Sequence, residues 1–171
     1  MGERAMPTQT MTEKDVFLAT LGREHETTMR LLRAYPADKA ELRASERSKT
    51  AREIAWMLAV TQQVIPHLLG HELPGMDPPP APPTWNEVLG AVQASHTDTM
   101  AKLRGMRPED MNSTVRLPVG PQKMADVRRG DAMWMFLYDM IHHRGQFSVY
   151  QRMAGGRMPS VYGPTADEPW W

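Results

Sequence analysis

The stretch that decides the fold is DMIHHRGQFSVYQRM, residues 139–153, where a helical apolar stripe coincides with the densest cluster of metal-ligating side chains in the chain. An α-helix turns by about 100° per residue, so Asp139 and His143, spaced i and i+4, project from the same side. His142 points elsewhere. The stretch therefore predicts a helix that presents a carboxylate and an imidazole together on one face.

The apolar stripe of this helix continues before residue 139. Its members recur at i, i+3, i+4, i+7, i+14 and i+17, and they are Met133, Phe136, Leu137, Met140, Phe147 and Tyr150. On a helical wheel His143 falls inside the stripe and Asp139 on its flank. We expect a helix from about residue 123 or 125 to residue 154, stopped by Gly155 in a left-handed conformation.

Three further helical segments precede this one. Apolar periodicity behind Ser or Thr N-caps predicts helices over about 12–35, 48–69 and 84–103. Pro66 removes a backbone donor from the second, so we expect a kink or an early end near residue 64. Prolines interrupt residues 107–122, which we expect to form a loop or at most a short extended piece.

Four long helical segments with short or proline-rich connections predict an all-α fold, an up-and-down four-helix bundle. In such bundles, metal and ligand sites are built from facing side chains. The 171 residues suit a single domain with one core, and we expect residues 1–11 and 157–171 to be irregular termini.

Composition narrows the class of function. The 20 basic residues balance 20 acidic ones, which argues against nucleic acid as a partner. The absence of cysteine excludes disulfides and thiolate zinc sites. No apolar run approaches the roughly 20 residues of a membrane span, and no signal peptide is apparent, so we expect a cytoplasmic protein without a membrane partner.

The residues alone leave two interpretations of the candidate site. Asp139 and His143 could chelate one metal ion, but zinc sites use at least three protein ligands. A third donor would come from another helix: Met57, whose soft thioether suits copper(I), or His25, a residue that at such a position is more often a core histidine. In the metal-free alternative, Asp139 accepts a hydrogen bond from an inward histidine or from Arg144.

The run HHRGQ at residues 142–146, followed by YQRMAG at 150–155 and by Pro, Tyr-Gly-Pro and Asp within residues 159–167, resembles the C-terminal signature of the DinB-like superfamily of DinB/YfiT-like metalloenzymes. The likeness extends to residues 24–32 and 51–56. It therefore covers most of the chain in the same order.

The resemblance implies an antiparallel four-helix bundle, commonly a homodimer. It also implies a divalent metal such as Zn, Ni or Fe, held by one histidine of the second helix and two histidines, four apart, on the last. Carried over, the last of these falls on His143, the one four residues earlier on Asp139, and the second-helix one on Met57. The metal site implied by resemblance is therefore His143, Asp139 and Met57, with two of its three histidines replaced.

Two functions follow from this resemblance. The first is a metal-dependent transferase or hydrolase-type enzyme acting on a small substrate that can be thiol-linked, in which the metal lowers the pKa of a bound thiol or water. The alternative is a non-catalytic dimeric stress-associated or small-ligand-binding bundle that has lost its metal. DNA binding, a third reading, finds little support in a neutral chain.

Overall fold

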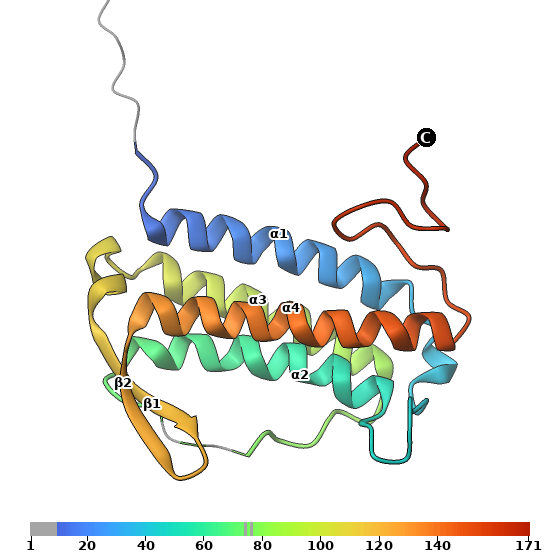
Figure 1. Ribbon diagram of the computed structural model, residues 1–171, viewed down its shortest axis with the longest axis horizontal. Coiled ribbons are helices and arrows are strands. Elements are labelled where there is room, and N and C mark those ends of the chain that lie inside the picture. The colour runs from blue at the N-terminus through green and yellow to red at the C-terminus, as the bar shows by residue number, and fades with distance from the viewer. Residues whose placement is uncertain (1–9, 74, 76) are drawn as a thin grey trace, which may run out of the picture.

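The computed structural model describes residues 10–73, 75 and 77–171 and is mostly helical. Four α-helices lie side by side (Figure 1), and we call them together the helical body. They are α1 (Glu13–Arg33), α2 (Ala51–Val64), α3 (Trp85–Arg104) and α4 (Arg129–Met153), with short 3₁₀ turns η1 (Ala37–Lys39), η2 (Ile65–Leu69) and η3 (Pro108–Asn112) between them. Helix α2 packs against α3 and α4, and α1 packs against the same two helices.

The first three helices begin where their N-caps predict. In each, the threonine side chain accepts from the backbone of the third helical residue, whose carboxylate accepts in return from the N-cap backbone. The pairs are Thr12 with Asp15, Thr50 with Glu53, and Thr84 with Glu87. Such a cap contributes about 1 kcal/mol to helix stability. The early end of α2 at Val64 is also confirmed, because the chain tightens into η2 around Pro66.

A β-hairpin connects α3 to α4, so the expectation of a purely α-helical chain is wrong. Strand β1 (Thr114–Gly120) pairs antiparallel with β2 (Lys123–Arg128). Residues 107–122, expected to be a loop or at most a short extended piece, contain the turn η3 and strand β1, and the last helix begins at Arg129 instead of near residue 123 or 125.

The hairpin forms because its first strand has a buried face. Val115 and Leu117 are buried while their neighbours Thr114 and Arg116 face solvent, the alternation that one-sided burial of a strand produces. Pro118 is tolerated because a two-stranded sheet consists only of edge strands, where a missing donor can face away from the partner.

The apolar stripe of α4 lies in the core as predicted. Met133, Leu137, Met140, Phe147 and Tyr150 are buried, and Phe136 is half-buried. The helix stops before Gly155, whose φ of 71° is the left-handed conformation expected there. This helix therefore places Asp139 and His143 beside the core.

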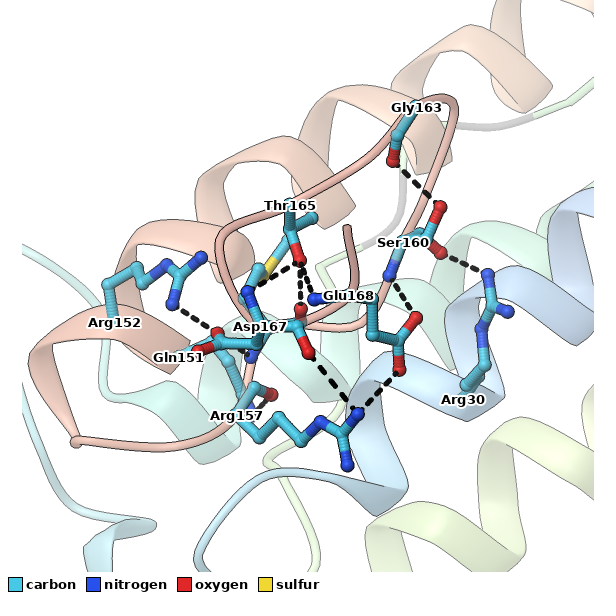
Figure 2. A network of polar contacts seen from close by, with 10 residues as sticks. Arg30, Gln151, Arg152, Arg157, Ser160, Gly163, Thr165, Asp167 and Glu168 are labelled. Atoms are coloured by element: carbon cyan, nitrogen blue, oxygen red, sulfur yellow. Dashed lines mark hydrogen bonds and ion pairs between the residues drawn. The ribbon is translucent and has the colours of Figure 1, made fainter. Parts of the chain in front are cut away.

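Residues 157–171 contain no helix or strand, as expected, yet polar contacts tie them to the helical body (Figure 2). Asp167 pairs with Arg152 of α4 and accepts from the backbone N–H of Met158 at 2.8 Å. Glu168 accepts from the backbone N–H of Ser160 at 2.7 Å. Among the described residues, no helix is long and apolar enough to cross a membrane.

Candidate functional site

The spacing of Asp139 and His143 on α4 brings their side chains together. His143 Nε2 lies 3.4 Å from Asp139 Oδ2. The same oxygen accepts from Thr61 Oγ1 of α2 at 3.2 Å. The predicted carboxylate–imidazole pair is therefore confirmed as a contact, and it lies where α4 faces α2.

The second ring nitrogen of His143 also faces an oxygen atom. Its Nδ1 lies 3.1 Å from Gln146 Oε1, and the amide nitrogen of Gln146 lies 3.0 Å from a ring nitrogen of His142. An ionised carboxylate and an amide oxygen only accept hydrogen bonds. Oxygen atoms beside both ring nitrogens therefore favour the protonated form of His143.

The pKa directions agree with this geometry. Pairing with His143 holds the pKa of Asp139 below its ordinary value, against the opposing effect of burial. Pairing with Asp139 raises the pKa of His143 above 6.5. Each group therefore favours the charged form of the other.

A cavity of about 300 Å³ opens beside Asp139. It is mainly apolar and lies along the α2–α4 seam, lined by Met57, Val60, Thr61, Gln63, Val64, His67, Asp77, Pro78, Pro79, Phe136 and Asp139. Trp56 Nε1 donates to the carbonyl of Pro79 at 2.7 Å, which fastens the proline segment over α2. We call this the seam cavity.

Met57 is half-buried and lines the seam cavity together with Asp139. His143 lies on the other side of Asp139 and lines a neighbouring cavity of about 460 Å³ with Ile54 and Lys49. Of the three residues carried over from the superfamily pattern, Met57 and Asp139 therefore share a cavity and Asp139 contacts His143, whereas Met57 and His143 line different cavities.

His25 is not part of this arrangement. It is only 4% exposed, and its ring stacks on that of His96 from α3 at a centroid distance of 3.8 Å. The prediction of a core histidine is confirmed, whereas its use as a third donor beside Asp139 is wrong because the ring faces α3. His96 itself is half-buried.

Arg144 does not pair with Asp139 either. It is 3% exposed, lies 2.6 Å from Glu24 of α1, and also contacts the Tyr162 hydroxyl. Of the metal-free networks considered from the sequence, the one that forms is that between Asp139 and an inward histidine. The role of Thr61 was missed, although its position on the inward face of the second helix was visible from the periodicity.

Comparison with known proteins places this geometry in a family. The sequence profile of the DinB superfamily matches residues 20–147, which span α1 to most of α4. The chain belongs to the DinB superfamily.

The relatives of this DinB-superfamily chain share its length and shape. It is 25% identical over 158 residues to the uncharacterized protein YrdA of Bacillus subtilis (strain 168), covering 90% of each chain. A DinB-like protein from Bacillus cereus superposes with a TM-score of 0.72 at 20% identity, over 85% of this chain and 95% of the other. The DinB-like protein YjoA of B. subtilis gives 0.66 at 12% identity, over 90% and 99%. The two structures support the fold alone.

The donor set of this DinB-superfamily chain does not fit the three-histidine metal site that the resemblance implies. Within the described residues, no group of three or more His, Cys, Asp or Glu side chains converges on one point. Met57 offers only a thioether, a poor ligand for zinc, nickel or iron. Oxygen atoms beside both ring nitrogens of His143 favour a proton on each, and a metal would have to displace one of these protons.

Proposed function

We propose that this DinB-superfamily protein is a metal-free, non-catalytic helical bundle that binds a small, mainly apolar molecule in the seam cavity. The observation that carries this proposal is the Asp139–His143 ion pair at 3.4 Å, which lies at the edge of that cavity where the superfamily pattern has two metal-binding histidines. A proton on His143 neutralises Asp139 in place of a metal.

The chemistry of the cavity supports an apolar ligand with one polar group. Ligand sites are typically concave, apolar and furnished with a few polar groups that fix orientation, and a volume of about 300 Å³ lies at the lower end of their usual range. Met57, Val60, Val64 and Phe136 supply the apolar wall. The Asp139 carboxylate supplies a hydrogen-bond acceptor at the rim, which favours a ligand that carries a hydrogen-bond donor.

Binding of a neutral apolar dye tests the proposal. N-phenyl-1-naphthylamine should bind the wild type with an increase in fluorescence, and Met57→Trp, which fills the cavity, should weaken binding at least tenfold. Met135→Trp is the matched control, because Met135 lies on α4 with 45% of its surface exposed and away from the cavity lining. Equal binding by wild type and Met57→Trp would refute the proposal.

A second candidate is the metal-dependent transferase or hydrolase-type enzyme acting on a small, for example thiol-linked, substrate. It is favoured by the cavity that Met57 and Asp139 share and by the contact of Asp139 with His143. Elemental analysis of protein purified without chelator decides between the two. Stoichiometric metal that is lost in Asp139→Ala supports the enzyme, whereas metal-free protein supports the ligand-binding bundle.

A further inference from the structure

Two histidines contact each other inside the helical body, away from the seam cavity. The rings of His25 (α1) and His96 (α3) are nearly parallel, with an interplanar angle of 4° and centroids 3.8 Å apart. Parallel rings direct their lone pairs side by side instead of toward one point, so the pair is not arranged to chelate a metal ion. The chemical property that this stack of two rings retains is protonation of either imidazole.

The polar atoms of this cluster are incompletely paired. Among the described residues, neither nitrogen of His25 makes a hydrogen bond of normal geometry, and the nearby side chain of Gln93 on α3 only partly offsets the effect of burial on its pKa. His96 Nδ1 lies 3.1 Å from Oε1 of Gln62, a fully buried residue of α2 whose amide nitrogen also has no partner in the described chain. Thr99 Oγ1 donates to the Gln62 carbonyl at 2.9 Å. Three helices thus meet at a polar cluster that holds no charge.

The surrounding ionisable groups do not supply a carboxylate to either ring. On α1, Glu24 is paired with Arg144 of α4 at 2.6 Å. The charges that act on the pKa of His25 are those of Arg33, which lowers it, and of the exposed Glu26, which raises it. On α3, the charge of Arg104 lowers the pKa of His96, and Asp98 is paired with Lys102 at 2.7 Å. The α2 contribution, Gln62, is neutral. Burial outweighs the favourable charge of Glu26 at His25, and the charges that act on His96 are those of His25 and Arg104, so a proton on either ring is disfavoured.

We propose that the His25–His96 stack is an acid-sensitive latch, which holds α1 against α3 while both rings are neutral and opens when one of them takes up a proton. The protonated ring gains solvation only by leaving the stack, since a charge buried without a partner is strongly disfavoured. Because Gln62 follows Thr61, the partner of Asp139, the movement reaches α2 next to the seam cavity.

The pKa directions set the pH window. Burial lowers the pKa of His25, and burial together with His25 lowers the pKa of His96 from 6.5 to about 4. The unfolded chain takes up these protons as the pH falls below about 6.5, whereas in the folded chain His25 requires a lower pH and His96 takes up its proton only near pH 4. Stability from the latch is therefore complete above pH 6.5 and is lost as the pH falls toward 4.

Urea unfolding between pH 7.5 and 4.5 tests the latch by comparing the wild type with the double variant His25→Phe/His96→Phe, which keeps stacked rings but cannot titrate. We expect the wild-type unfolding equilibrium constant to rise between these pH values by roughly 50- to 100-fold more than that of the double variant, by linkage. The exposed His67→Gln is the matched control and should follow the wild type. Parallel losses in wild type and double variant would overturn the proposal.

Histidine NMR of the wild type gives a second readout that does not depend on the folding of the double variant. The chain has six histidines; His96 should remain neutral to well below pH 6, and the pKa of His25 should lie below its ordinary value. Titration of all six near pH 6.5 would also overturn the latch.

Discussion

The Asp139–His143 pair and the His25–His96 stack of this helical body differ in their partners, their burial and the direction of their pKa shifts. His143 faces a carboxylate and an amide oxygen at the half-exposed α2–α4 seam, and its pKa is raised. His25 stacks on His96 in the interior without an anionic partner, and the pKa values of both rings are lowered. The groups beside an imidazole, more than the imidazole itself, therefore decide whether a buried histidine is protonated or stays neutral.

The largest expected effect comes from giving the interior pair the carboxylate it lacks. Gln62→Glu places an acid next to His96 and should raise the pKa of that ring above 6.5. Stability from the new pair is then present at low pH and lost as the pH rises through the raised value, the reverse of the wild type. We expect a loss of about 3 kcal/mol at pH 8, where the buried carboxylate is unpaired.

Urea unfolding at pH 6 and pH 8 measures this reversal. The neighbouring Gln63→Glu is the control: Gln63 is exposed and its amide donates to Ser95 Oγ at 2.9 Å, so this variant should lose about 1 kcal/mol, by the same amount at both pH values. A Gln62→Glu variant that is more stable at pH 8 than at pH 6 would show that His96 does not respond to its partner.

Removing the acid at the seam should convert the charged pair into a neutral one. Asp139→Asn leaves His143 without its anionic partner, so the pKa of His143 falls. The pair stabilises the fold above the lowered pKa of Asp139 and below the raised pKa of His143, and the loss should be about 1 kcal/mol or less at pH 6 because both groups are partly solvated. An NMR titration of His143 and urea unfolding at pH 6 and 9 check both statements. A loss as large at pH 9 as at pH 6 would contradict them.

The smallest expected effect concerns the hydroxyl that orients Asp139. Thr61→Val removes the 3.2 Å hydrogen bond to Asp139 Oδ2 and keeps the shape of the side chain. Because Asp139 retains its ion pair, we expect a loss of roughly 0.5–1 kcal/mol and a small rise in the pKa of Asp139. Carboxylate NMR measures the pKa, and an unchanged value would remove Thr61 from the site.

The same contrast explains how much could be predicted from sequence. The Asp139–His143 contact follows from the helical period, and the starts of α1, α2 and α3 follow from threonine caps and their acidic partners, all of which act within a few residues. The His25–His96 stack and the Arg144–Glu24 pair join different helices, so no local pattern reveals them. The hairpin was missed because Pro118 reads as a strand breaker, while the pairing of its strands depends on burial of Val115 and Leu117 against the helical body.

The central claim is that a proton on His143 stands where the superfamily pattern has a metal. Nitrogen-resolved histidine NMR at pH 6.5, before and after one equivalent of Zn²⁺, tests it most directly. If a proton takes the place of the metal, both ring nitrogens of His143 carry a proton in at least half of the molecules, and zinc leaves the signals unchanged. Loss of one proton from His143 on addition of zinc, with a shift of its ring nitrogen, would show instead that the site binds metal.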